Sequence, residues 1–248
     1  MTDWLLREGE RLDDLVRDGM RIIQREDEFC FSIDSVLLAH YTVIRKQDII
    51  ADLGTGTGVI PLLLTSREAV NITAFEINPV MADIARRNVE GNHRGELIHV
   101  IEGDYRNAPL TFGSGAFSSL VVNPPYREAG SGRMSPIRGV ASASYELDAS
   151  LEDVFKVASK ILKYGGRITM VHRADRLADL ITYGRAYRME VKRMRFVYAR
   201  KGHTAVRILM EFRYGGHPEA QVDPPLLLHK SDGTYTDEVL CMFGKDRQ

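Results

Sequence analysis

The sequence predicts an α/β fold in which helices cover both faces of a mostly parallel, seven-stranded sheet. Apolar, strand-like segments alternate with segments of helical periodicity, a pattern typical of parallel sheets. A glycine-rich stretch, residues 54–58, follows the first strand at the point where such folds turn into a helix. The last two strands have no helical segment between them, so we expect an antiparallel C-terminal edge.

The expected strands and helices alternate along the chain from residue 48 onward. The strands are Asp48–Leu53, Ile72–Ile77, Leu97–Gly103, Ser118–Asn123, Arg167–His172, Glu190–Ala199 and Arg207–Tyr214. The helices are Gly58–Ser66, Pro79–Asn92, Ser150–Leu162 and Ala174–Tyr183. Gly165-Gly166 is expected to end the third helix, since glycine commonly terminates helices.

The two ends of the chain carry further elements. Residues 1–47 are expected to form an N-terminal extension that folds onto a single domain, 48–248. Within the extension, Arg21–Phe31 reads as extended and Ser32–Arg45 as a helix capped by Ser32 or Asp34. The tail predicts an extended Leu226–His229, a turn at Asp232-Gly233 and a short helix beginning near Asp237.

The composition indicates a globular protein of the cytoplasm. Residues 1–10 are polar and do not resemble a signal peptide, and no apolar run reaches the roughly 20 residues of a membrane helix. Cys30 and Cys241 lie far apart and outside any His cluster, which predicts no metal site. The composition does not determine the oligomeric state.

The charge is distributed unevenly, although the net charge is only −1. The segment Arg167–Arg213 has 12 Lys and Arg residues against 4 Asp and Glu residues. Such a segment can attract a phosphate backbone, or it can be an ordinary solvated surface. If it binds RNA, the residues expected to do so are Arg193, Arg195, Arg200 and Lys201.

A cofactor site is expected directly after the first strand. Asp52 precedes Gly54, Gly56 and Gly58, and these glycines let the backbone pass close beneath a ligand. A dinucleotide-binding loop would have its third glycine at position 59, which is Val59, and a pyrophosphate disfavours an adjacent carboxylate. A methionine moiety with an amino group and a sulfonium suits that carboxylate, so the motif favours S-adenosylmethionine over NAD.

Acidic residues also end the next two strands. Glu76 can accept hydrogen bonds from both ribose hydroxyls, and Asp104 from the adenine amino group. A single acid at a strand end is often a helix cap. Three acids at successive strand ends all lie at the edge where these folds bind ligands, which favours a cofactor site.

A candidate catalytic tetrapeptide, Asn123-Pro124-Pro125-Tyr126, follows the fourth strand. Two prolines cannot continue a central strand, so the chain turns away and presents the Asn123 side-chain oxygen and the Pro124 carbonyl. Two acceptors holding the N–H bonds of a planar amine would orient it and return electron density to its nitrogen. Tyr126 offers a face on which the acceptor group can stack.

With this tetrapeptide, the chain resembles the class I methyltransferases, Rossmann-like enzymes whose NPPY motif methylates adenine N6, cytosine N4 or a glutamine amide. Further stretches are similar to the bacterial tRNA-valine adenine-N6 methyltransferases, namely Ile23-Gln24, Phe31–Ala39, Glu76-Ile77-Asn78, Pro224–Leu226 and Asp232–Thr236. The resemblance implies an RNA substrate, expected to be tRNA. It also implies that Phe31 and Ser32 fold over the cofactor, and that Ile77, Tyr105 and Asn123 lie against it.

Three other functions are compatible with the motif. Release-factor glutamine methyltransferases resemble the chain but carry a helical domain for which 47 residues are too few. DNA adenine methyltransferases would need a separate recognition domain. A cofactor-binding subunit without activity is disfavoured by the intact tetrapeptide.

The stretch after the tetrapeptide, residues 127–144, is rich in Gly and Ser and is expected to close over a flipped base. Arg127, Arg133 and Arg138 would then reach phosphates.

Overall fold

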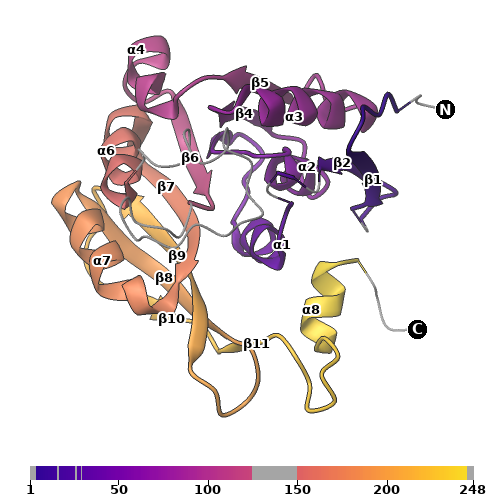
Figure 1. The fold of residues 1–248 in the computed structure, drawn as a ribbon. Coiled ribbons are helices and arrows are strands. Elements are labelled where there is room, and N and C mark those ends of the chain that lie inside the picture. Colours follow the sequence, from indigo (N-terminus) through magenta and orange to yellow (C-terminus); the bar gives the residue numbers. More distant parts are fainter. Residues whose placement is uncertain (1–3, 16, 26, 29, 125–149, 245–248) are drawn as a thin grey trace.

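The computed structural model describes residues 4–15, 17–25, 27–28, 30–124 and 150–244. A central sheet has the strand order β10-β8-β9-β7-β6-β3-β4-β5, with β11 also paired to β8 (Figure 1). Its seven long strands match the predicted ones: β3 (Ile49–Leu53), β4 (Asn71–Glu76), β5 (Ile98–Glu102), β6 (Phe117–Val122), β7 (Leu162–Arg173), β8 (Met189–Tyr198) and β9 (Ala205–Tyr214).

Strand direction confirms the predicted antiparallel edge. The strands β5, β4, β3, β6 and β7 pair in parallel, whereas β9 is antiparallel to both β7 and β8. The carboxyl ends of β3 to β7 therefore share one edge with the end of β8 and the beginning of β9. We call this edge the carboxyl edge of the sheet.

Helices cover both faces of the sheet (Figure 1). One face carries α1 (Ile33–Tyr41), α2 (Val59–Thr65) and α3 (Pro79–Gly91), and the other carries α4 (Ala108–Phe112), α6 (Leu151–Ile161) and α7 (Leu177–Ala186). All six residues of β6 are buried, as expected for a central strand covered on both sides. Two short 3₁₀ helices, η1 (Tyr105–Asn107) and η2 (Ala174–Arg176), precede α4 and α7.

The N-terminal segment forms a hairpin that was only partly predicted. Its strands are β1 (Glu10–Asp14) and β2 (Arg21–Arg25), and they pair in antiparallel fashion. An ion pair between Arg87 and Glu10 (2.6 Å) ties the hairpin to α3. The Glu10 side chain is almost completely buried in this pair, so the hairpin is firmly attached.

The C-terminal tail lies against β8, where it adds two short strands to the predicted seven. These are β10 (Gln221–Val222) and β11 (Leu226–Leu227), both parallel to β8. A turn around Asp232-Gly233 leads into α8 (Asp237–Met242), as predicted. The prediction for Gly165-Gly166 was wrong: α6 ends at Ile161, and both glycines lie inside β7.

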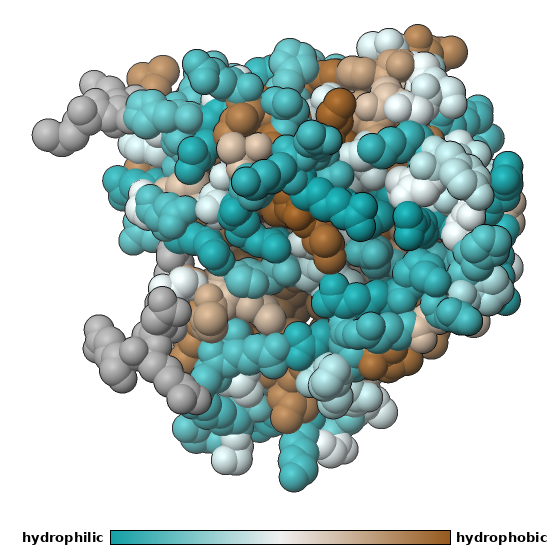
Figure 2. Space-filling model, turned by 180° about the vertical axis from the view of Figure 1, so that it is seen from behind, coloured by the Kyte–Doolittle hydropathy of each residue, from teal (hydrophilic) through white to brown (hydrophobic). Residues whose placement is uncertain are grey.

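No helix in the described ranges is long and apolar enough to span a bilayer. Seen from behind, the molecule is largely hydrophilic, and its apolar side chains show in separate places (Figure 2).

Asn88 provides a test of how the hairpin is held. This fully buried side chain donates to the carbonyls of Ile23 (3.2 Å) and Thr57 (2.9 Å) and accepts from the Ile23 N–H (2.6 Å). Asn88→Ala leaves these three buried backbone groups without hydrogen-bond partners. We therefore expect a loss of about 3 kcal/mol in the free energy of unfolding, measured by urea denaturation. Asn92→Ala is the matched control, because Asn92 makes the equivalent bonds to Arg21 at the surface. Equal losses in the two variants would contradict this account.

Candidate active site at the carboxyl edge

The glycine loop after β3 has the backbone that the sequence predicts. Gly54, Gly56 and Gly58 all have positive φ angles of 79°, 58° and 82°, which side chains with a Cβ rarely adopt. A Cβ on Gly54 would meet nothing within 4 Å, so space for a ligand lies beside it. At Gly58 the nearest atom is Cβ of Ala85 (3.4 Å), where the loop packs against α3.

Asp52 is buried in β3 just before this loop. Its side chain is fully buried, and neither carboxylate oxygen has a hydrogen-bond partner among the described residues. Burial raises the pKa of Asp52 to about 7, the Thr55 hydroxyl opposes the rise, and the charge of Glu76 adds to it. A buried carboxylate without a partner is costly, and a cationic group would relieve that cost. The residue therefore fits the ammonium of a methionine moiety.

Glu76 ends β4 and is held by backbone N–H groups on two sides. Gly56 donates to its Oε2 (2.7 Å) and Asn78 to its Oε1 (2.9 Å). Its own carbonyl accepts from Gly103 (2.8 Å), in the loop after β5. The carboxylate is fixed in position, and its oxygens have lone pairs with which to accept ribose hydroxyls.

Asp104 follows β5 but caps a helix in this structure. Its carboxylate accepts from the backbone N–H of Arg106 (2.8 Å) and pairs with the Arg106 guanidinium (2.6 Å). These contacts occupy both oxygens and match the helix-cap alternative. A role toward the adenine amino group stays a prediction. The neighbouring Tyr105 packs against the core beneath α6.

The segment before α1 lies near the end of β4. Phe31 packs on the core shared by α1 and α2, and its N–H donates to Gln24 (2.9 Å). Glu28 lies 3.5 Å from the amide of Asn78, two residues beyond Glu76 and next to the partly exposed Ile77. Ser32 occupies the N-cap position of α1, as predicted, although its side chain makes no cap hydrogen bond. This placement is compatible with an N-terminal cover over the cofactor.

The candidate catalytic residues begin where β6 ends. The Asn123 amide nitrogen lies 3.5 Å from the hydroxyl of Ser35, a buried residue of α1, and this contact helps to orient the amide. Pro124 is buried directly after it. Because β6 and β3 are paired neighbours, Asn123 follows the strand next to Asp52 and the glycine loop. Pro125, Tyr126, Arg127, Arg133 and Arg138 lie outside the described residues, as does the proposed closing stretch 127–144.

Two of the four arginine and lysine residues proposed for RNA binding make contacts with the C-terminal tail. Arg193 pairs with Asp223 and stacks over the ring of Tyr41 at 4.1 Å. Arg195 donates to the Pro224 carbonyl (2.9 Å) and pairs with Glu238 (2.7 Å). Their face of β8 is covered by the tail, which sequence alternation alone could not reveal. Arg200 and Lys201 are exposed in the turn between β8 and β9.

Comparison with known proteins identifies the family. The model of the methyltransferase small domain matches residues 32–183. A tRNA1(Val) (adenine(37)-N6)-methyltransferase of Porphyromonas gingivalis is 31% identical over 192 residues, 75% of this chain and 74% of the relative. The chain belongs to the methyltransferase small domain family. Another relative of the same name, from Aeromonas hydrophila, is 26% identical and covers 84% of this chain and 85% of its own.

Solved structures confirm the class I methyltransferase fold. A predicted O-methyltransferase from Agrobacterium tumefaciens superposes with a TM-score of 0.67 at 24% identity, covering 87% of this chain and 98% of its own. The tRNA m1G37 methyltransferase of M. jannaschii gives 0.59 at 15% identity, covering 86% and 59%.

Family and fold together confirm the predicted enzyme class and cofactor: the protein is an S-adenosylmethionine-dependent methyltransferase. Asp52, Gly54 and Glu76 are the residues whose geometry fits that cofactor. Among the residues that the structure describes, no cluster of three or more His, Cys, Asp or Glu side chains could hold a metal ion.

The buried carboxylate of Asp52 predicts a pH-dependent cost to stability. Between about pH 4 and pH 7 the folded chain keeps the proton that the unfolded chain releases, so its stability falls as the pH rises. Asp52→Asn removes that loss, and we expect the ligand-free variant to be more stable than the parent by roughly 2–4 kcal/mol at pH 8 and by less than half as much at pH 5. Urea denaturation at both pH values measures this gain.

Calorimetry should at the same time show weaker S-adenosylmethionine binding to Asp52→Asn, because the carboxylate is lost. Asp14→Asn is the control, since that side chain is 81% exposed and should change neither quantity. An equal gain at pH 5 and pH 8 would contradict the assigned ionisation.

Proposed function

We propose that the protein transfers a methyl group to N6 of an adenine in tRNA. The relatives that cover most of the chain are named for this reaction on tRNA1(Val), at adenine 37. The observation that carries the proposal is the position of Asn123, which directly follows β6 at the carboxyl edge, beside the strand that leads into the glycine loop. A tRNA substrate would support the cytoplasmic location that the sequence predicts.

Asp52 and Glu76 would hold two different parts of the cofactor. Asp52 would accept from the methionine ammonium, and Glu76, fixed by Gly56 and Asn78, would accept from the ribose hydroxyls. When bound, S-adenosylmethionine supplies a methyl group activated by its sulfonium. Gly54 leaves open space beside the loop, which the cofactor could occupy.

Asn123 and Pro124 would act on the acceptor amine. The adenine N6 lone pair is delocalised into the ring, which makes it a weak nucleophile. Two oxygen acceptors on its N–H bonds would favour the pyramidal, more nucleophilic nitrogen and align it without a strong base. The contact between the Asn123 amide nitrogen and Ser35 would help to aim the side-chain oxygen. Tyr126 would stack on the flipped base.

The substrate would approach across the carboxyl edge. The turn between β8 and β9 presents Arg200 and Lys201 to solvent at this edge, where they can contact phosphates. Arg193 and Arg195 are engaged with the tail.

Asn123→Ala tests the catalytic assignment. Because the side chain would act on the acceptor, we expect turnover on tRNA to fall by about 100-fold or more while the Kd for S-adenosylmethionine changes little. Turnover is measured by mass spectrometry of N6-methyladenosine in tRNA. Asn71→Ala is the control. Asn71 begins β4, at the end of the strand away from the carboxyl edge, and the variant should behave like the parent. Retention of most of the rate by Asn123→Ala, or methylation by the parent of protein glutamine but not of RNA, would overturn the proposal.

A further inference from the structure

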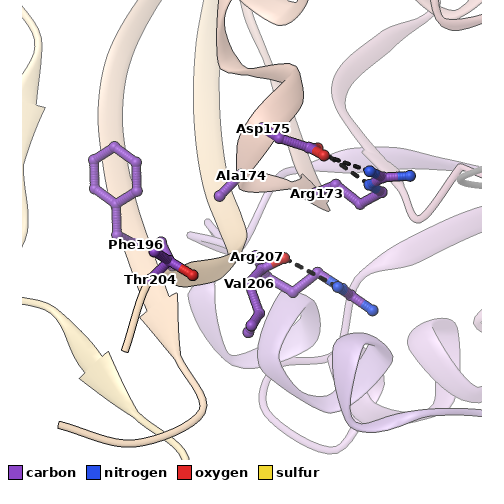
Figure 3. Close-up of a pocket in the computed structure, with 8 residues that line it drawn as sticks. Arg173, Ala174, Asp175, Phe196, Thr204, Val206 and Arg207 are labelled. Carbon is purple, nitrogen blue, oxygen red and sulfur yellow. Dashed lines mark hydrogen bonds and ion pairs between the residues drawn. The ribbon is translucent and has the colours of Figure 1, made fainter. Parts of the chain in front are cut away.

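A hollow of about 530 Å³ lies beside the candidate active site and is not part of the cofactor site. It lies where β7 leads into η2 and where β9 begins, with one side formed by β8 (Figure 3). Its volume is in the range typical of small-ligand sites. None of its lining residues belongs to the glycine loop, β4 or β5, so the proposed cofactor contacts leave it unexplained.

Strand register places this hollow next to the acceptor position. Val122 of β6 pairs with Met170 of β7, so Asn123 and Arg173 leave the sheet at the same edge on neighbouring strands. Arg173 in turn faces Arg207 across the β7–β9 pair. Neighbouring strands are about 4.8 Å apart, so the hollow begins roughly 5–15 Å from the end of β6. An RNA strand with its target nucleotide in the active site would have the neighbouring nucleotides near this hollow.

The lining combines an aromatic and aliphatic floor with a charged rim. Phe196, Ala174 and Val206 supply the apolar part, and Thr204 adds a hydroxyl. Arg173 and Asp175 form an ion pair on the rim with both side chains about half exposed, at 49% and 57%. Figure 3 shows these two side chains on the side of the hollow opposite Phe196.

The second arginine of the lining is held in place from α1. Arg207 donates to Asp34 (2.9 Å), a buried residue of that helix. Both arginines of the lining are thus paired with a carboxylate, Arg173 with Asp175 and Arg207 with Asp34, and the pair of Arg173 is the more exposed. Single-stranded RNA is bound by this combination of an aromatic face for a base and cationic groups for the backbone.

We propose that this hollow binds the base of a nucleotide next to the target adenine, with Arg173 on the adjoining phosphate. The inference rests on the proposed function and names the part of the RNA that the hollow binds. Extruding a base from its stack costs free energy, and capture of its neighbour offsets part of that cost. Asp175, held by Arg173, can accept from an amino group on the edge of the captured base.

Two substitutions separate the two contacts. Phe196→Leu keeps an apolar side chain against the core but removes the aromatic face, and Arg173→Ala removes the guanidinium. We expect each to raise the KM for a tRNA stem-loop about tenfold with little change in the Kd for S-adenosylmethionine. Arg173→Ala should also reduce the slope of log KM against log salt concentration by about one, whereas Phe196→Leu should leave it unchanged.

Arg185→Ala is the matched control. Arg185 is an exposed arginine paired with Glu190 (2.8 Å), but it lies near the amino end of β8, away from the carboxyl edge. It should leave both the KM and the salt slope as in the parent. If Phe196→Leu and Arg173→Ala keep the KM of a methylating parent, or if Arg185→Ala raises it equally, the inference fails while the proposed function stands.

Substrates that lack one base identify the captured nucleotide. Stem-loops with an abasic site directly before or after the target adenine are assayed with the parent and with Phe196→Leu. At one of these two positions the abasic site should raise the KM of the parent about tenfold and add little in Phe196→Leu. Fully additive effects at both positions would overturn the inference. A parent that methylates no RNA would overturn the proposed function as well.

Discussion

The carboxylate of Glu76 is the constraint on which the candidate site depends. The carboxylate accepts hydrogen bonds from the loop after β3 and from the residue before α3. The backbone carbonyl of Glu76 accepts one from the loop after β5. The Phe75 carbonyl completes the arrangement by accepting from Gly54 (3.0 Å) and Thr55 (2.9 Å). Three loops that are separate in the sequence are thereby fixed to one strand end. The glycines tolerate the positive φ angles that this requires, so loop geometry and carboxylate position depend on each other.

The burial of a second carboxylate, that of Asp52, near Glu76 costs electrostatic free energy. Asp52 is buried without a hydrogen-bond partner among the described residues, close enough to Glu76 for the two charges to disfavour each other. Such an arrangement persists only where the surrounding fold is rigid. The packed cores on both faces of the sheet, together with the buried ion pair of Arg167 and Asp48 (2.5 Å) at its opposite edge, provide that rigidity. Functional sites commonly carry costs of this kind, because the ligand relieves them.

The sequence was informative wherever a local pattern determines structure. Apolar, strand-like segments located the seven long strands, and the glycine loop together with Asp52 and Glu76 indicated the candidate site. It was less informative where a distant segment decides the outcome. Strands β10 and β11 have two residues each and exist only through pairing with β8. Gly165-Gly166 lies in β7 between Leu162, which pairs with Phe117 of β6, and Arg167, from which β7 pairs with both β6 and β9. This long-range pairing on either side overrides the tendency of glycine to end a helix.

The basic region shows how one charge pattern can serve two purposes. The charge count predicts a single basic surface. In the structure the arginines of this region lie in two separate places. Along β8, Arg193 and Arg195 point toward α1 and the tail, where Tyr41, Asp223 and Glu238 occupy them. At the carboxyl edge, Arg173 and Arg207 are also paired with carboxylates, but they line a hollow beside the end of β6. The position of an arginine therefore indicates its function better than its ion-pair partner does. An exposed ion pair is weak, and its carboxylate can be exchanged for a phosphate. By this argument the half-exposed pair of Arg173 with Asp175 can open to RNA, whereas the more buried pair of Arg195 with Glu238 keeps the tail in place.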